Sequence, residues 1–304
     1  MVPEDGRMAG VDENELAARF EEHRAHLRAV AYRMLGSLSE ADDAIQETWL
    51  RLSRVGAADV ENLRGWLTTV VSRVCLNMLR SRNTRREESL DRHLPDPVVS
   101  AEGGLSPEEE ALLADSVGLA LLIVLDTLSP AERLAFVLHD MFGLPFEDIA
   151  AMVDRSPTAA RQLASRARRR VRSADVAGPD ADLPRQRAVV DAFFSAARGG
   201  DFDALVTLLH PDVVLRADFG DRRPSAAGVT RGAAAVAGQA VRGALPHAEL
   251  HPVLVNGAAG VVVTVRGRPF AVLGFTVTDG TIVEIQAIVD SERVGRIAAG
   301  VLHG

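Results

Sequence analysis

The sequence predicts three consecutive domains, two built only of helices and a third of α+β type. Apolar residues recur at helical spacing from Leu16 to about Arg86, and again from Ser106 to Arg172. Beyond Pro184, short helical patterns give way to alternating, strand-like runs. Segments rich in Pro, Gly, Asp and Ser separate the three parts. We therefore predict domains at 14–88, 106–173 and 185–304, with linkers at 89–105 and 174–184.

Composition limits the class of protein. The chain has 304 residues, 47% of them apolar, which is long enough for several folded domains and too apolar for a mostly disordered chain. A single cysteine, Cys75, rules out an intrachain disulfide framework. We find no secretory leader and no apolar run of membrane-spanning length. We therefore expect a cytoplasmic protein that has no contact with membranes, no metal site and no cofactor.

The charge is unevenly distributed. The net charge is −8, but the basic residues, all of them arginine, are concentrated in two windows. Local charge decides nucleic-acid binding more than the net value does. We therefore treat the two arginine-rich windows as candidate DNA contacts.

The first domain begins with two helices. The first runs to Gly36, and the second begins at Ser39. Helical spacing assigns Ala41, Ala44, Ile45, Thr48, Trp49 and Leu52 to the buried side of the second helix. Its outer face is acidic with one apolar position, and consists of Asp42, Asp43, Gln46, Glu47 and Leu50. An ordinary solvated helix face is the alternative interpretation.

A third helix, from Leu63 to Arg82, contains the first basic window. No acidic residue occurs between Glu61 and Glu87. The candidate DNA contacts in this window are Arg64, Trp66, Arg73, Asn77 and Arg80. Taken alone, a tryptophan at helical spacing is more often a core residue.

The linker that follows contains Leu94-Pro95-Asp96-Pro97, which favours an extended path. Helices resume at two capping boxes that begin at Ser106 and Ser129, each with proline at the first helical position. Pro95 and Pro97 suit a plain stiff spacer equally well.

The second basic window reads as a helix-turn-helix. A short amphipathic helix, Pro145 to Val153, is followed by Asp154-Arg155-Ser156 and by a helix capped by Ser156. No acid lies between Asp154 and Asp175, so we expect the seven arginines there to be unneutralised. A solvated charged helix is the alternative. Four side chains near the start of this helix can reach base edges: Thr158, Arg161, Gln162 and Ser165. Three arginines further along would contact phosphates: Arg166, Arg168 and Arg169.

The third domain has helical patterns at 185–197, 201–209 and around 230–242. Strand-like runs follow at 249–255, 260–265, 269–277 and 282–289, with Asn256-Gly257 and Asp279-Gly280 as hairpin signals. We expect helices laid against a curved antiparallel sheet. Such an arrangement leaves room for a pocket that takes a small apolar ligand.

Three motifs, in this order, resemble extracytoplasmic-function (ECF) sigma factors of the SigJ type. Asp42-Asp43-Ala44-Ile45-Gln46-Glu47-Thr48-Trp49-Leu50-Arg51 is similar to their core-polymerase-binding helix. Leu63 to Val71 resembles their promoter-melting and minus-10-reading segment, and Ser156 to Val171 their minus-35-reading helix. Members of this branch carry a SnoaL-like C-terminal domain, which matches the predicted α+β domain. The resemblance covers nearly the whole chain.

The resemblance implies roles for residues along the chain. The acidic face would dock on the clamp of the polymerase largest subunit, and the two basic windows would contact promoter DNA. Leu94-Pro95-Asp96-Pro97 resembles the family's linker motif, which the C-terminal domain would hold. The family's Asp-Gly-Gly-Gly-Lys stretch reads here as Asp218-Phe219-Gly220-Asp221-Arg222, and its Asn-Pro-Asp-Lys-Leu segment as Asp290-Ser291-Glu292-Arg293-Val294. The implied regulatory residues are Pro95, Asp96, Pro97, Asp218 and Arg222.

We therefore expect a non-catalytic sigma factor regulated in cis, for which the sequence requires no separate anti-sigma factor. Two alternatives remain: a one-component helix-turn-helix regulator that senses a small molecule, and a SnoaL-type enzyme tethered to DNA-binding domains. The only tyrosine, Tyr32, lies in the first domain, which weakens a mechanism of the ketosteroid-isomerase kind. His247 and His251 flank Glu249 beside prolines, which is unlike a helical zinc site.

Overall fold

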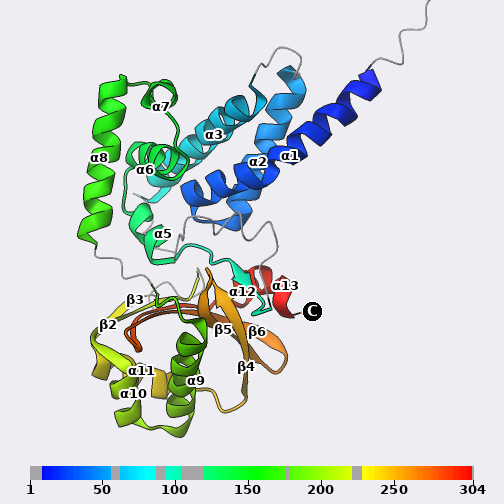
Figure 1. Cartoon of the computed structure of the whole chain (residues 1–304). Coiled ribbons are helices and arrows are strands. Elements are labelled where there is room, and N and C mark those ends of the chain that lie inside the picture. Colours follow the sequence, from blue (N-terminus) through cyan, green and yellow to red (C-terminus); the bar gives the residue numbers. More distant parts are fainter. Residues whose placement is uncertain are drawn as a thin grey trace, which may run out of the picture. The chain divides into compact units, whose positions relative to one another are not determined.

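The computed structural model describes residues 9–55, 62–86, 94–103, 119–174, 179–220 and 228–302. The chain forms two compact units, Met1–Ser89 with Val124–Ala174, and Leu90–Ile123 with Asp175–Gly304. Among the described residues the first unit is helical and the second combines helices with one sheet (Figure 1). The predicted fold class is confirmed. The two helical parts, predicted as separate domains, cluster in one unit, and the first predicted linker belongs with the sheet.

Three helices form the first part of the helical unit: α1 (Ala9–Leu35), α2 (Leu38–Val55) and α3 (Leu63–Arg86). Gly36 ends α1 with a φ of 69°, a conformation that glycine adopts without steric cost. The predicted inner side of α2 is confirmed, because Ala41, Ala44, Ile45, Thr48 and Leu52 are buried. Trp49 lies at the margin of this side, where its ring meets Phe20 edge to face at 5.2 Å.

The second part begins at Val124, within α5 (Leu119–Asp126). It continues with α6 (Pro130–Phe136), a π-helical turn η1 (Val137–Met141), α7 (Phe146–Val153) and α8 (Pro157–Ser173). The capping box predicted at Ser129 is present at the start of α6, where Ser129 and Glu132 satisfy each other's backbone N–H groups. The capping box predicted at Ser106 lies outside the described residues.

Two buried arginines join these parts. The Arg33 guanidinium of α1 lies 5.0 Å from the centre of the Phe142 ring. Arg133 of α6 donates from Nε to the Arg33 carbonyl oxygen at 3.2 Å and pairs with Asp126 at 3.1 Å. Both arginines are no more than 2% exposed. Because a buried guanidinium needs partners, these contacts fix how α1 and α6 pack against each other.

The second unit is built on a seven-stranded sheet of order β1-β4-β5-β6-β7-β2-β3. Neighbouring strands are antiparallel except for β2 and β7, which are parallel. The strands are β1 (Val99–Ser100), β2 (Leu209–Asp218), β3 (Gly228–Arg231), β4 (Ala248–Val255), β5 (Ala258–Val265), β6 (Arg268–Thr278) and β7 (Thr281–Ile288). Both predicted hairpins are confirmed, since Asn256 and Asp279 take positive φ between paired strands.

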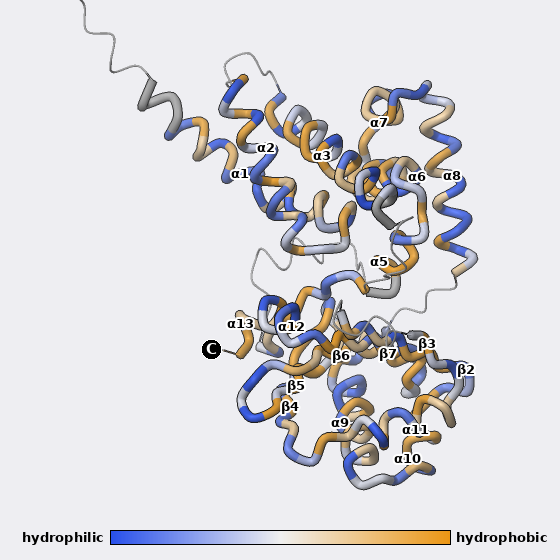
Figure 2. The backbone as a smooth tube through the Cα atoms, turned by 180° about the vertical axis from the view of Figure 1, so that it is seen from behind, coloured by the Kyte–Doolittle hydropathy of each residue, from blue (hydrophilic) through white to orange (hydrophobic). Residues whose placement is uncertain are grey.

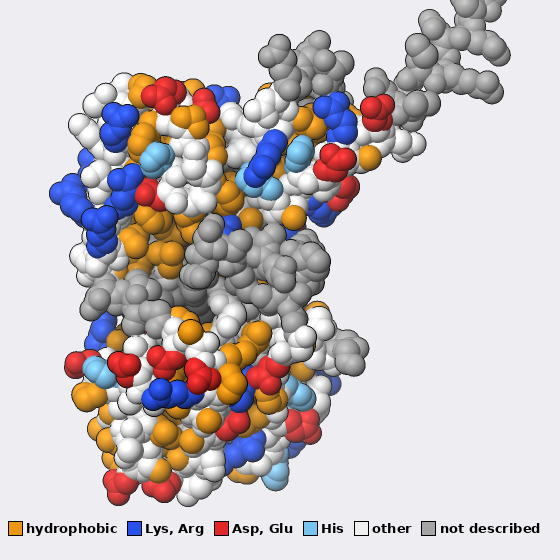
Figure 3. Space-filling model, in the orientation of Figure 1, with side chains coloured by type: hydrophobic (Ala, Val, Ile, Leu, Met, Phe, Trp, Pro, Cys, Tyr) orange, Lys and Arg blue, Asp and Glu red, His pale blue; other side chains and the backbone are white. Residues whose placement is uncertain are grey.

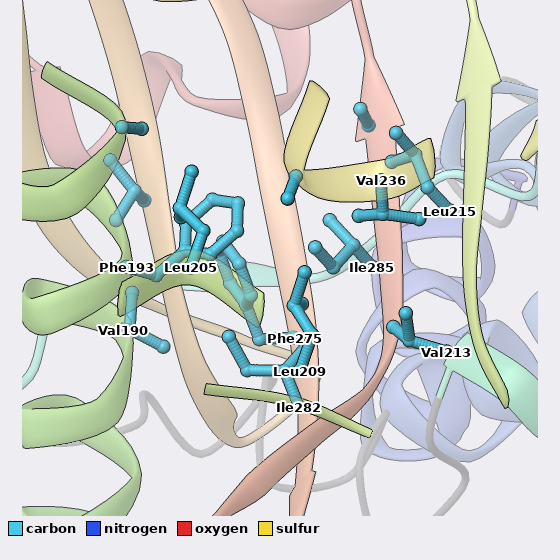
Figure 4. Packing of buried hydrophobic residues seen from close by; sticks show 14 of the residues in the cluster. Val190, Phe193, Leu205, Leu209, Val213, Leu215, Val236, Phe275, Ile282 and Ile285 are labelled. Carbon is cyan, nitrogen blue, oxygen red and sulfur yellow. The ribbon is translucent and has the colours of Figure 1, made fainter. Parts of the chain in front are cut away.

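Helices cover both faces of this sheet. On one face lie α9 (Leu183–Gly199), α10 (Phe202–Leu208) and α11 (Ala233–Gly243), which enclose the larger core (Figure 4). In this core Phe193 packs edge to face against Phe275 at 5.6 Å. On the other face, α12 (Ser291–Ile297) and α13 (Ala299–Leu302) join linker residues Leu94 and Val99 in a smaller core. Figure 2 shows that the strands are largely apolar, whereas apolar and polar residues alternate along the helices.

The sequence missed three features of the second unit. Val99 and Ser100 form an edge strand on β4, so the described part of the linker is not a plain spacer. Strand β2 begins at Leu209, at the end of the segment predicted as helical at 201–209, and runs to Asp218. The last turns of the chain, α12 and α13, were not predicted as helices.

His26 of α1 is held in its neutral form. Its Nε2 lies 3.2 Å from Thr68 Oγ1, and an Arg64 N–H group lies 3.3 Å from its Nδ1. Arginine can only donate, so Nδ1 accepts and Nε2 carries the proton. Burial, followed by the charges of Arg64, His23 and Arg33, lowers the pKa of His26 from 6.5 to about 4.

We predict that acid weakens the helical unit through His26. Between pH 6.5 and about 4 the unfolded chain binds a proton that the folded chain excludes, so stability falls as the pH falls. The slope is at most about 1.4 kcal/mol per pH unit, and smaller because the ring is partly exposed. Urea unfolding at pH 5 and 7.5 measures the loss. Tryptophan fluorescence suits this measurement because both tryptophans lie in α2 and α3.

His26→Gln keeps one donor and one acceptor but does not titrate, and should reduce the difference between the two pH values. His247→Gln, an exposed position in the other unit, serves as the control and should leave that difference unchanged. An equal loss in wild type and His26→Gln would contradict the assignment.

Candidate nucleic-acid interface and linker clamp

The basic helix α8 is positioned by a tight turn after α7. Asp154 ends α7 in the left-handed conformation, with a φ of 54°. Ser156 then caps α8 by accepting from the Ala159 N–H at 3.2 Å, and Pro157 occupies the first turn. Ala160, Ala164 and Ala167 are fully buried against α6 and α7. This is the geometry of a helix-turn-helix, whose second helix presents its outer face to DNA.

The predicted base-reading residues share one exposed face. Thr158, Arg161, Gln162 and Ser165 all lie on the side opposite the buried alanines, and Arg169 continues this face one turn further. Arginine side chains gather over α8 (Figure 3). The Arg161 guanidinium lies 5.2 Å from the centre of the Phe146 ring, which supports it from α7.

The expectation that all seven arginines are unneutralised is wrong. Arg166 and Arg170 pair with Glu132 of α6 at 3.2 and 3.1 Å, and Arg168 pairs with Asp140 of η1 at 2.6 Å. These three arginines flank the exposed face, where they meet acids from neighbouring elements rather than from α8 itself. The sequence around α8 does not reveal these ion pairs, because Glu132 and Asp140 lie far from their arginines along the chain.

Glu132 therefore serves two elements. Its carboxylate accepts from the Ser129 backbone N–H at 3.2 Å, which closes the capping box, and from the Ser129 hydroxyl at 2.8 Å. The same carboxylate also pairs with two arginines of α8. Burial opposes its ionisation. The hydrogen bonds from Ser129 and the charges of Arg170 and Arg166 together outweigh that effect and lower the pKa of Glu132. The carboxylate thus remains charged and fixes α8 to α6.

The first basic window divides between two sides of α3. Trp66, Arg73, Asn77 and Arg80 recur at helical spacing along one face, where the arginines and Asn77 are exposed and Trp66 is partly buried. Arg64 lies on the opposite side, next to His26. Arg73 donates to the carbonyl oxygen of Ala151 in α7 at 3.1 Å, so in this structure part of the α3 face contacts the second helical part.

The acidic face of α2 is accessible. Asp42, Asp43, Gln46 and Leu50 are exposed, and Leu50 retains 41% of its surface. Asp42 pairs with Arg28 of α1 at 2.9 Å, and Glu47 pairs with Arg51 one turn along. Neither the hydrogen bonds nor the ion pairs of the described residues include the Asp43 carboxylate.

The predicted regulatory residues meet at one arginine. Arg293 of α12 pairs through Nε with Asp96 at 2.6 Å and through an NH₂ group with Asp218 at 2.7 Å. Its other NH₂ group donates to the carbonyl oxygen of Leu94. Asp218 also accepts from the Leu94 N–H at 2.7 Å. We call this arrangement of Leu94, Asp96, Asp218 and Arg293 the linker clamp.

The linker clamp is buried. Asp218 is 2% exposed and Asp96 is 8% exposed. Pro95 and Pro97 are buried as well, although neither belongs to the polar contacts. Arg222, the remaining predicted regulatory residue, lies outside the described residues.

Gly220 fits the clamp because it has no side chain. Its φ is 64°, and a Cβ atom there would lie 2.1 Å from an Asp290 carboxylate oxygen. Its N–H donates to Asp218 at 2.9 Å. Asp290 in turn caps α12 by accepting from the Glu292 and Arg293 N–H groups. The turn after β2 and the start of α12 therefore form one packed unit.

Arg293 was not among the predicted regulatory residues. It lies in Asp290-Ser291-Glu292-Arg293-Val294, where it occupies the lysine position of the family segment and keeps the charge. A second missed contact is Arg187 of α9, which pairs with Glu102 and donates to the carbonyl oxygens of Val253 and Gly260. Arg293 could have been found from the sequence, because it keeps the positive charge of the family's lysine although the neighbouring residues differ.

Within the described residues, no group of three or more His, Cys, Asp or Glu side chains could hold a metal ion. The described helices include none that is long and apolar enough to span a membrane.

Comparison with known proteins gives two family matches. Residues 19–85 match the Sigma-70 region 2 family and residues 119–171 match the Sigma-70, region 4 family. The chain is 42% identical over 218 residues to the ECF RNA polymerase sigma factor SigJ of Mycobacterium tuberculosis, which covers 71% of this chain and 69% of that one. It is 41% identical over 201 residues to the probable ECF RNA polymerase sigma factor SigI of the same species, covering 65% and 68%.

The fold is also similar to a solved structure. The crystal structure of the Mycobacterium tuberculosis extracytoplasmic function sigma factor SigJ superposes with a TM-score of 0.72 at 34% sequence identity. The match covers 93% of this chain and 98% of that one, and therefore includes both units.

Proposed function

The chain belongs to the ECF RNA polymerase sigma factors, and we propose which of its residues carry each step of promoter recognition. As a member of this family it acts in transcription initiation, with core RNA polymerase and promoter DNA as its partners. Family membership removes the alternative of a one-component regulator. One observation supports the residue assignment. Arginines at the sides of α8 form ion pairs with acidic residues, whereas Arg161 and Arg169 on its exposed face form none among the described residues.

The exposed face of α8 reads the minus-35 element in this proposal. Thr158, Arg161, Gln162 and Ser165 are short or planar donors near the helix N-terminus, the part of a recognition helix that reaches base edges. Arg169 contacts a phosphate. Arg166 and Arg168, predicted as phosphate contacts, instead position the helix through Glu132 and Asp140.

The minus-10 element is contacted by α3. Arg73, Asn77 and Arg80 line one face with Trp66, so a melted strand can meet charge and an aromatic surface together. Arg73 donates from one NH₂ group to the Ala151 carbonyl oxygen and is exposed, so its other N–H groups are the ones that contact DNA in this proposal. Arg64 acts on the opposite side through His26 and supports the helix rather than the DNA.

Core polymerase binds the acidic face of α2. Asp43, Gln46 and Leu50 combine a carboxylate without an ion pair, an amide and an exposed apolar side chain, which suits a charge-steered interface with an apolar centre. Asp42 and Glu47, both engaged by arginines in this structure, lie at its margin.

The linker clamp regulates in cis. While Leu94 is held, only residues 87–93 separate it from the end of α3, so that stretch can span at most about 30 Å. Release of the clamp removes this limit on how far the α1–α3 part can move from the C-terminal unit. In this proposal the clamp therefore limits the arrangements in which α3 can meet promoter DNA.

The C-terminal unit regulates and does not catalyse. Asp218, the acid on which a tethered enzyme would depend, is buried in the clamp and paired with Arg293. His210 and His247 are exposed, and His251 bonds Thr264 at 2.9 Å. No shared pocket gathers these histidines in the described part of the unit.

Gln162→Ala should weaken binding to the cognate minus-35 sequence by about 1–3 kcal/mol and relax base preference, because a base-edge contact is lost.

Arg169→Ala should weaken binding to all sequences and reduce the salt dependence of binding by about one phosphate contact. Arg166→Ala is the matched control and should leave the salt dependence unchanged. Fluorescence anisotropy with the holoenzyme over a salt series measures these effects. Equal salt dependence in wild type and Arg169→Ala would rule out the phosphate role.

Asp43→Arg should lower affinity for purified core polymerase by at least about tenfold, because it places a like charge in a steered interface. Glu22→Arg makes the same charge change at an exposed position of α1 and should bind core as the wild type does. Titration of labelled full chain into core, followed by run-off transcription, tests both binding and initiation. If neither wild type nor variant binds core, the sigma assignment fails.

Arg293→Ala should release residues 94–100, because both buried carboxylates lose the guanidinium that joins them. Hydrogen exchange at the Leu94 and Val98 amides should rise, and output from a cognate promoter should change several-fold. Arg296→Ala removes an exposed arginine from the same helix and should alter neither. Faster exchange with unchanged transcription would show that the clamp has no regulatory role.

A further inference from the structure

A cavity of about 250 Å³ lies between the sheet and helices α9 and α11 in the C-terminal unit. Its inner wall includes the apolar core residues Phe193, Leu215, Val236 and Ile285, which are labelled in Figure 4. Gly243 and Leu245, at the end of α11, are exposed and mark its mouth. The cavity is larger than the engineered void of about 150 Å³ that binds benzene, so it can hold a molecule of two or more rings.

The side chains that line the cavity indicate which kind of ligand it can bind. Among the described residues that line the cavity, only Arg198 and Gln239 have polar side chains, and none has an ionisable acid, histidine, tyrosine or cysteine. Arg198 donates to the carbonyl oxygen of Ala248 at 2.7 Å. The Gln239 carbonyl oxygen accepts from Thr230 at 2.7 Å, which orients its amide NH₂ group as the donor for a ligand.

A charged group buried against the apolar walls would lose its hydration without gaining a partner there, because the one charged side chain of the described lining, Arg198, is exposed and donates to the Ala248 carbonyl oxygen. The occupant that fits is uncharged, mostly apolar, and carries one acceptor such as a ketone or ether oxygen. Without an acid or base in the lining, the cavity binds a ligand rather than transforming it.

The cavity and the linker clamp share the ends of two strands. Along β2, Leu215 and Ala217 face the cavity, whereas Asp218 faces the clamp, as alternation requires. Phe219, the next residue, lines the cavity again. Val289 at the end of β7 also lines the cavity, and its N–H donates to the carbonyl oxygen of Asp218 at 2.7 Å.

We propose that this cavity binds an uncharged, largely apolar small molecule with one hydrogen-bond acceptor, and that binding strengthens the linker clamp. A ligand that packs against Ala217, Phe219 and Val289 orders the strand ends that present Asp218 to Arg293. It therefore binds the clamped state more tightly than the released state, which is the condition for coupling. The coupling rests on the regulatory role proposed for the clamp, whereas the binding site does not.

Binding is tested on the full chain with prodan, an uncharged naphthalene ketone whose emission shifts in apolar surroundings. We expect saturable binding of one prodan per chain. Ala240→Phe places a ring in the cavity and should abolish it, whereas Ala234→Phe makes the same change on the exposed side of α11 and should leave it intact. Gln239→Leu keeps the cavity but removes the donor, and should weaken prodan several-fold. Absence of saturable binding, or equal binding by the Ala240 and Ala234 variants, overturns the site.

Coupling is tested by the reciprocal effect. If the ligand favours the clamped state, Arg293→Ala must weaken prodan binding several-fold, while Arg296→Ala must not. Unchanged or tighter binding by Arg293→Ala overturns the coupling. Thermal unfolding of each variant shows that it is folded. Transcription without ligand tests the clamp separately, so failure of the cavity and failure of clamp regulation give different results.

Discussion

The interaction on which the C-terminal unit depends is the guanidinium of Arg293 between two buried carboxylates. Each of its nitrogen positions has a partner, and these partners come from the linker, from the end of β2 and from the linker backbone. A lysine would supply a point charge in place of this planar fork and could not reach all of them with the same geometry. Because removal of the cation leaves two acids in a low-polarity site, the contact stays closed unless something compensates for that cost. A buried ion pair of this kind suits a switch with two distinct states better than a gradual adjustment.

The helical unit uses the same chemistry in a different way. Its charged residues are sorted by position on α8, where flanking arginines meet Glu132 and Asp140, and Arg161 of the central face lies over the Phe146 ring. The paired arginines stabilise the orientation of the helix, and the remaining ones keep their charge for a polyanion. The net charge of the chain therefore says little about its affinity for DNA, because the acids that make it negative lie elsewhere.

The sequence predicted most of the secondary structure, and physical reasons separate its successes from its failures. The strands β4 to β7 were found because Asn-Gly and Asp-Gly turns interrupt alternating apolar runs. The start of β2 was missed because His210, Pro211 and Asp212 are exposed there and show no strand pattern. The α8 face followed from helical spacing alone. Its ion pairs did not, because partners tens of residues away are set by packing between helices. Arg293 was overlooked because its neighbours depart from the family motif, although its charge does not.

The two-residue strand β1 covers one edge of the sheet, and detachment of β1 would expose the edge of β4. When the linker leaves, the outward backbone groups of Leu254 and the Asn256 N–H, which bonds the Val98 carbonyl oxygen, lose their partners and can pair with a strand from another molecule. Pro252 limits this hazard, because it lacks an N–H and cannot extend such a ladder along β4. An intermolecular ladder on this edge of β4 would therefore be interrupted at Pro252.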